Sequence, residues 1–113
     1  MDTGTVRAHF LPDALCAPAH LDFEVAKVIR RLYVRRELTE ERAGAAMEAL
    51  TELPIRRIPL ADLLPRVWEL RDNAYTGDAL YLALAEELGC PLVTTDSKLV
   101  GVPGHHANVE TLT

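Results

Sequence analysis

Three acidic residues, Glu24, Asp78 and Asp96, lie where surface carboxylates are not expected, on apolar helix faces or directly after an apolar strand. Clustered carboxylates repel one another unless a divalent cation neutralises them. An all-oxygen ligand set favours Mg²⁺ or Mn²⁺ over Zn²⁺. Such a cation activates water and stabilises an in-line displacement at phosphorus. If the three carboxylates meet, their chemistry is metal-assisted displacement at phosphorus.

Glu24 falls inside a helical pattern that runs from His20 to Arg36. The apolar positions 21, 25, 28 and 32 of this segment fall on one face of a helix, and Glu24 lies in the middle of that face. A buried carboxylate is costly unless it is paired or binds a metal. The alternatives are a salt bridge to a distant arginine or a different phase of the helix.

The environments of Asp78 and Asp96 are inferred from the predicted helix and strand that contain or precede them. Asp78 is the third residue of a predicted helix that starts at Thr76, and it shares the apolar face of that helix. The simpler interpretation of Asp78 is a first-turn aspartate that the helix dipole stabilises. Asp96 follows the apolar run 92–95, and ligand sites in open α/β sheets lie at the carboxyl ends of strands. An ordinary turn aspartate is the alternative for Asp96.

The elements that must position these residues alternate between helices and short strands. Thr39 is predicted to cap a helix that Pro54 stops, and Thr76 to cap a helix that Gly89 ends. Another helix is predicted over 62–73. The predicted strands cover 15–17, 55–58, 92–95 and 109–112. This alternation predicts an α/β fold with a parallel sheet.

Composition excludes several classes of protein. The chain has 113 residues, of which 49% are apolar and 26% charged, so a single globular domain is expected. No window approaches the ~18 uncharged apolar residues of a membrane span, and no signal peptide is recognised. Two isolated cysteines indicate reduced thiols in a cytoplasmic protein. A net charge of −5 argues against general nucleic-acid binding unless a metal or a basic patch inverts the local charge.

Other polar and aromatic residues have simpler interpretations. Trp68 and Tyr81 are predicted to lie in the core, and Glu86 to be an ordinary charge on a helix surface. Arg56 and Arg57, on the predicted strand 55–58, could contact RNA or protect a sheet edge.

Several segments resemble, in order and spacing, the PIN-domain ribonucleases, specifically the VapC toxins of toxin–antitoxin pairs. These segments are Pro18–Val25, Leu53–Ile55, Trp68–Asn73, Gly77–Glu86 and Leu92–Asp96. The resemblance implies a PIN-like three-layer α/β/α fold with a short parallel sheet, formed as one domain over residues 1–113. It also implies a metal-dependent endoribonuclease of a type II toxin–antitoxin system. Its partners would be an RNA substrate, a cognate VapB-like antitoxin and a second toxin in a homodimer.

The same resemblance assigns the metal ligands. It carries the acidic ligands of the family, for Mg²⁺ or Mn²⁺, onto Glu24, Asp78 and Asp96. PIN domains of this kind open with a central apolar strand that ends in a ligating aspartate, whereas this chain starts Met1-Asp2-Thr3 with no apolar strand before Asp2. We therefore expect an N-terminally shortened domain, in which Asp2 could substitute for that ligand and residues 1–10 could supply a strand.

Two other functions fit the sequence. The first is a catalytically inactive PIN remnant that acts by binding an antitoxin or a dimer partner. The second is an α/β signalling domain that uses Asp96 as an acidic switch, which leaves Glu24 unexplained.

Overall fold

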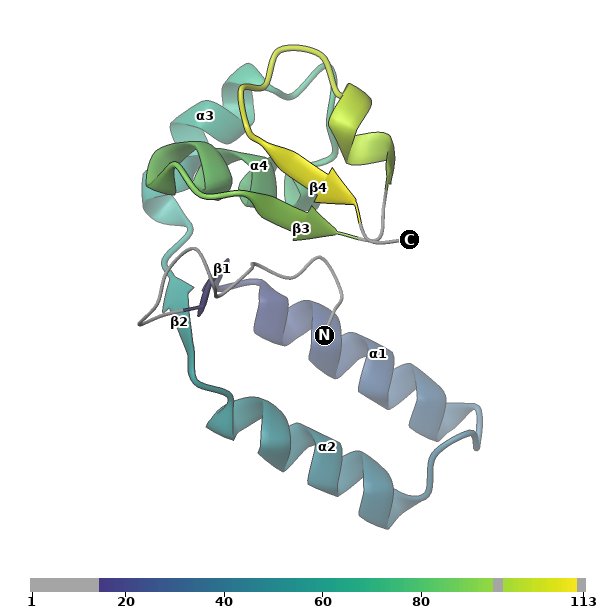
Figure 1. The fold of residues 1–113 in the computed structure, drawn as a ribbon. Helices are drawn as coiled ribbons and strands as arrows, with labels where there is room; N and C mark the ends of the chain where they lie inside the picture. Colours follow the sequence, from purple (N-terminus) through teal and green to yellow (C-terminus); the bar gives the residue numbers. More distant parts are fainter. Residues whose placement is uncertain (1–14, 95–96, 112–113) are drawn as a thin grey trace.

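A computed structural model describes residues 15–94 and 97–111 of the chain (Figure 1). Four α-helices, four short strands and two 3₁₀ helices follow one another along these residues. In chain order they are β1 (Leu15–Pro18), α1 (Leu21–Val34), α2 (Glu40–Glu52), β2 (Ile55–Ile58), η2 (Ala61–Leu63), α3 (Leu64–Glu69), α4 (Thr76–Leu88), β3 (Leu92–Thr94), η3 (Ser97–Gly101) and β4 (Val109–Thr111). No helix in this part of the chain is long and apolar enough to cross a membrane.

The strands pair in parallel, as the alternation of helices and strands predicts. β1 pairs with β2, and Leu15 lies opposite Ile55; β3 pairs with β4, and Leu92 lies opposite Val109. Over the described ranges these pairs form two two-stranded sheets, both parallel, which agrees with the expected α/β fold with a short parallel sheet. In Figure 1, β1 and β2 lie between the α3–α4 pair and the α1–α2 hairpin. The expectation that residues 1–10 supply a strand lies outside the described residues.

Helix α4 lies at the centre of the core. Every residue from Ala79 to Ala85 is buried, which is typical of a helix covered on all sides. Its neighbours include α3, β1 and β3. Gly89 ends the helix in the left-handed conformation, with φ of 66°, as predicted. The N-cap is Tyr75 rather than Thr76, because Thr76 already belongs to the helix.

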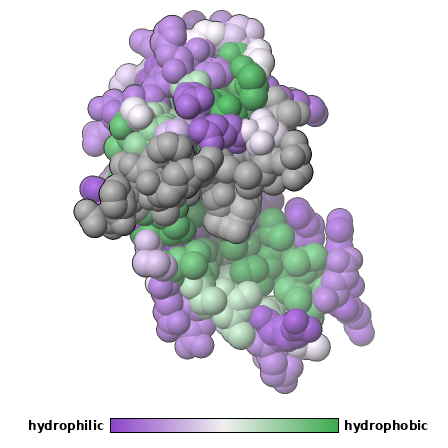
Figure 2. All heavy atoms as spheres, viewed as in Figure 1, coloured by the Kyte–Doolittle hydropathy of each residue, from purple (hydrophilic) through white to green (hydrophobic). Residues whose placement is uncertain are grey.

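The α1–α2 hairpin projects from the rest of the chain (Figure 1). Thr39 caps α2 as predicted, and its side chain accepts a hydrogen bond from the backbone N–H of Arg42 at 3.2 Å. The predicted phase of α1 is partly wrong, because Ile29 is buried whereas Val28 is exposed. Figure 2 shows apolar side chains gathered over the hairpin. Met47, on α2, is among the exposed large apolar residues of the chain.

Arg57 holds the base of this hairpin together. Its Nε lies 3.2 Å from both carboxylate oxygens of Asp22, and its other nitrogens donate to the backbone carbonyls of Leu50, Leu53 and Ile55. These contacts join α1, the end of α2 and β2. Arg57 therefore has a structural role that neither of the sequence-based interpretations included.

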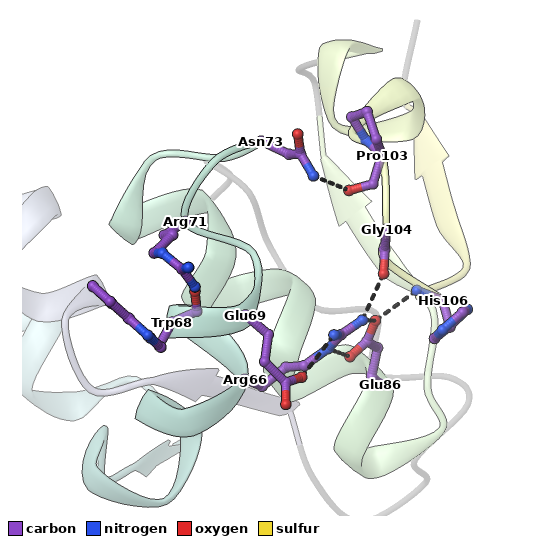
Figure 3. Close-up of polar contacts among 9 residues, drawn as sticks. All are labelled: Arg66, Trp68, Glu69, Arg71, Asn73, Glu86, Pro103, Gly104 and His106. Atoms are coloured by element: carbon purple, nitrogen blue, oxygen red, sulfur yellow. Dashed lines mark hydrogen bonds and ion pairs between the residues drawn. The ribbon is translucent and has the colours of Figure 1, made fainter.

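A second cluster joins α3 and α4 to the loop before β4 (Figure 3). Arg66 donates to both carboxylate oxygens of Glu86, to Glu69 and to the carbonyl of Gly104. Glu86 also accepts the backbone N–H of His106 at 2.6 Å. These donors hold the pKa of the Glu86 carboxyl below its usual value, and Arg66 contributes most. The prediction that Glu86 is an ordinary surface charge is wrong, because its partners lie far away in sequence.

The prediction that Trp68 belongs to the core is also wrong. Helix α3 ends at Glu69, and the Trp68 side chain is 66% exposed. The Arg71 guanidinium lies 4.3 Å from the centre of the indole ring and donates a hydrogen bond to the Trp68 carbonyl. The ring therefore packs against a cation at the surface instead of against the core.

Candidate active site

The carboxylate of Glu24 reaches from α1 to the first turns of α4. The Tyr81 hydroxyl donates a hydrogen bond to Glu24 Oε1 at 2.8 Å. The other oxygen, Oε2, lies 3.6 Å from Nε2 of His20, which occupies the N-cap position of α1 without a capping hydrogen bond from its side chain. A Cβ atom added to Gly77 would lie 3.4 Å from the same Oε2. One carboxylate oxygen is therefore fixed by a donor, and the other lies beside the start of α4.

Glu24 is less buried than its place on the predicted apolar stripe implied. Its side chain is 45% exposed, because the buried face of α1 is centred on Leu21 and Ile29. The alternative for Glu24, a salt bridge to a distant arginine, is made by Asp22 instead. Glu24 therefore lies at the border between the buried face of α1 and solvent.

Tyr81 is buried, as predicted, but its hydroxyl also serves the site. The side chain is 8% exposed, and its ring centre lies 4.8 Å from that of His20. Burial, the hydrogen bond to Glu24 and the nearby charges of Glu24, Asp22 and Asp78 raise the Tyr81 pKa well above its ordinary value. The hydroxyl therefore stays protonated and donates to Glu24 at neutral pH. Its place on an apolar helix face gave no sign of this second role.

Asp78 lies in the first turn of α4 and is partly buried. Gly77, the residue before it, lies beside Glu24 Oε2, so both acidic residues lie at the start of α4. Asp96 and Asp2 lie outside the described residues, and their convergence with this pair stays a prediction. Within the described ranges, no three His, Cys, Asp or Glu side chains form a group that could hold a metal ion.

The surroundings of this carboxylate pair suit a hard cation. Gly77 leaves space beside Glu24 where any other residue would place a side chain. Both ring nitrogens of His20 are buried and make no hydrogen bond to the part of the chain that the structure describes. Two carboxylates at one helix end supply the oxygen ligands that Mg²⁺ and Mn²⁺ prefer. The donor chemistry of Glu24 and Asp78 therefore fits such a cation, and their role as its ligands stays a prediction.

Comparison with known proteins places the chain in a family. Residues 5–104 match the PIN domain. The chain is 39% identical to ribonuclease VapC12 of Mycobacterium tuberculosis over 94 residues, which are 83% of this chain and 73% of the relative. It is 41% identical to ribonuclease VapC3 of the same organism over 103 residues, or 90% of this chain and 75% of the relative. Identity to ribonuclease VapC1 is 45% over 89 residues, or 78% of this chain and 67% of the relative. The chain therefore belongs to the PIN-domain family, and its relatives within that family are VapC proteins.

Proposed function

We propose that this protein is a metal-dependent endoribonuclease that cleaves RNA phosphodiesters as the toxin of a type II toxin–antitoxin system in the cytoplasm. The observation that carries the proposal is the position of the Glu24 carboxylate at the start of α4, where Tyr81 binds one oxygen and the other lies beside Gly77, the residue before Asp78. The ribonuclease names of the VapC relatives support the same reaction.

The proposed cation is Mg²⁺ or Mn²⁺, held by Glu24, Asp78 and Asp96. When bound, such an ion supplies an activated water and neutralises charge that develops on the phosphate. Tyr81 orients Glu24, because its buried hydroxyl donates to Oε1 and leaves Oε2 facing the start of α4. Gly77 keeps that approach free of a side chain.

The proposed partners are an RNA strand, a VapB-like antitoxin and a second copy of the toxin. The α1–α2 hairpin presents an apolar surface, and the apolar residues that line a groove there include Ile29, Ala43 and Met47, as a toxin that binds a protein partner requires (Figure 2). Contiguous apolar surface of this kind commonly marks a protein interface. The same surface would serve the alternative function, an inactive PIN remnant that acts only by binding.

The test combines metal binding with RNA cleavage. Mn²⁺ binding is measured by calorimetry, cleavage of a single-stranded RNA is followed with Mg²⁺, with Mn²⁺ and without metal, and binding of a VapB-like antitoxin is measured separately. Glu24→Gln and Asp78→Asn should each weaken Mn²⁺ binding and abolish cleavage, because each removes one negative ligand. Glu48→Gln, on the exposed face of α2, is the matched control and should leave both unchanged.

Two outcomes would contradict the proposal. If both carboxylate variants bind Mn²⁺ as the wild type does, Glu24 and Asp78 are not ligands. If the wild type cleaves no RNA with either metal but still binds an antitoxin, the protein is the inactive remnant.

A further inference from the structure

A cavity of about 760 Å³ lies beside Asp78. Residues 71–75, which connect α3 to α4, form one wall, and residues of η3 and the turn after it, between Lys98 and Pro103, form the other. Its volume is within the ~300–1,000 Å³ of typical ligand sites. Because Asp78 is also a lining residue, whatever fills the cavity lies next to the proposed site of cleavage.

The two walls are fastened to each other (Figure 3). Asn73 Nδ2 donates to the carbonyl of Pro103 at 3.1 Å, directly between the walls. Arg66 donates to the carbonyl of Gly104 at 2.7 Å, and Glu86 accepts the backbone N–H of His106. These bonds fix the turn after η3 to α3 and α4. The cavity is therefore formed before any ligand binds, which lowers the entropic cost of binding.

Tyr75 is the lining residue that folding explains least. It occupies the N-cap of α4, yet its side chain makes no capping hydrogen bond, and it is 86% exposed. Ser, Thr, Asp or Asn at an N-cap stabilises a helix by ~0.5–2 kcal/mol relative to residues that cannot cap. A tyrosine here gives up that stabilisation and leaves an aromatic ring in solvent. An aromatic ring in this place suits the stacking of a planar ligand.

The charges around the cavity are balanced. Arg71 and Lys98 supply two cations, while Asp72 and Asp78 supply two anions. Arg71 is held in place by the Trp68 ring and carbonyl, so its position does not depend on a ligand. A bare anion gains little from such a balanced lining. A nucleotide fits better, because its base is neutral and planar and its phosphates can meet the cations at the rim.

We propose that this cavity is a nucleotide subsite, in which an unpaired base of the RNA strand stacks on Tyr75 while Arg71 and Lys98 face the adjoining phosphates. The inference rests on the proposed function, and it adds Tyr75 as the residue that binds an unpaired base beside Asp78. A base in a duplex is already stacked and paired, so it cannot enter. Base–aromatic stacking tolerates every base, so this contact selects unpaired RNA rather than a particular sequence.

The test measures RNA binding apart from cleavage. The full chain carries Glu24→Gln, which lies outside the cavity lining and prevents cleavage under the proposed function. Binding of a fluorescein-labelled single-stranded RNA 12-mer is followed by anisotropy, and a duplex of the same sequence is the comparison. Tyr75→Ala should weaken binding of the single strand about 5- to 150-fold, from the ~1–3 kcal/mol of one stacked base. Tyr75→Phe should bind as the parent does, and the duplex should respond to neither change.

Tyr75→Ser separates the ligand role from a structural one. Serine can cap α4, so this variant should melt at a higher temperature than the parent while it loses the same RNA affinity as Tyr75→Ala. If Tyr75 were structural, both properties would fall together. Tyr33 is also exposed but lies on α1. Its substitution Tyr33→Ala controls for a general loss of aromatic surface and should leave RNA binding unchanged.

The possible results separate this inference from the proposed function. Equal affinities of Tyr75→Ala and its parent overturn the subsite, even if the wild type cleaves RNA. Binding that depends on Tyr75 supports the subsite, even if the wild type never cleaves. No binding of single-stranded RNA by the parent overturns the subsite as well.

Discussion

Removing one oxygen atom from Tyr81 tests whether this residue positions Glu24. Tyr81→Phe keeps the buried ring and deletes only the hydroxyl that donates to Glu24 Oε1 at 2.8 Å. Because the Tyr81 ring is buried, the phenylalanine should occupy the same space. Glu24 then loses the donor that fixes its orientation. We expect weaker binding of Mn²⁺ together with a modest loss of stability.

The magnitude follows from the burial of the two partners. A hydrogen bond to a charged group contributes ~1.5–3 kcal/mol when it is shielded from water. The Glu24 side chain is 45% exposed, so water replaces part of the lost bond. We therefore expect the free energy of unfolding to fall by about 1 kcal/mol, below that range. Loss of an orienting partner typically weakens metal binding ~10–100-fold.

The assay is urea unfolding of four proteins: the wild type, Tyr81→Phe, Glu24→Gln and the double variant. The double-mutant cycle isolates the coupling between the two side chains. Because the folded-state pKa of Tyr81 is raised, this hydroxyl stabilises the fold fully below its ordinary pKa near 10. That stability is lost as the pH rises above 10, where the unfolded chain ionises first. The alkaline loss should be smaller in Tyr81→Phe than in the wild type.

Two results would refute this reasoning. If the changes in unfolding free energy are additive in the cycle, the hydrogen bond contributes nothing. If Tyr81→Phe loses stability but binds Mn²⁺ with unchanged affinity, Tyr81 is only a core residue. Tyr33→Phe, which alters an exposed hydroxyl on α1, is the matched control and should resemble the wild type in both measurements.

Three further predictions concern other residues. Glu86→Gln should lower the free energy of unfolding by ~1–3 kcal/mol at pH 7. The lowered pKa of Glu86 means that the wild type loses this advantage as the pH falls below about 4.5, so urea midpoints that differ equally at pH 3 and pH 7 would contradict the prediction. Gly77→Ala should stabilise α4 by ~0.5–1 kcal/mol, yet weaken Mn²⁺ binding in calorimetry, because its methyl group would lie 3.4 Å from Glu24 Oε2; unchanged affinity would contradict this. Arg57→Lys should lower the melting temperature, because a lysine cannot reproduce the bonds that Arg57 makes to one carboxylate and three carbonyls; an unchanged melting temperature would show that these bonds are dispensable.

Part of the candidate site could be predicted from the sequence. Glu24 and Asp78 each interrupt a predicted apolar helix face, and in the structure the Glu24 carboxylate lies at the start of α4, the helix whose first turn contains Asp78. The third residue, Asp96, stays a prediction. The hydrogen bond of the Tyr81 hydroxyl could not be predicted, because the sequence pattern of a tyrosine on an apolar face is the same whether or not its oxygen has a partner. Tyr75 was missed too, because exposure cannot be read from a single aromatic residue.

The sequence by itself determined most of the elements and several of their ends, although α3 ends at Glu69 and not at the predicted position 73. Thr39 caps α2, Gly89 ends α4, and the strand at 55–58 lies where its pattern predicts. These features depend on capping side chains, backbone preferences and periodicity over a few neighbouring residues. These helix ends and this strand are therefore encoded by neighbouring residues, and they do not depend on which other elements pack against them.

Only the tertiary structure decided which polar side chains pair. Arg66 and Glu86 are 20 residues apart, Arg57 and Asp22 are 35 apart, and Tyr81 and Glu24 are 57 apart. No periodicity links positions so distant, since their contact depends on how whole helices and strands pack. The same packing buried Ile29 in place of Val28 and left Trp68 in solvent. A helical pattern predicts that an apolar face exists, but the element that packs against this face decides which of its residues are buried.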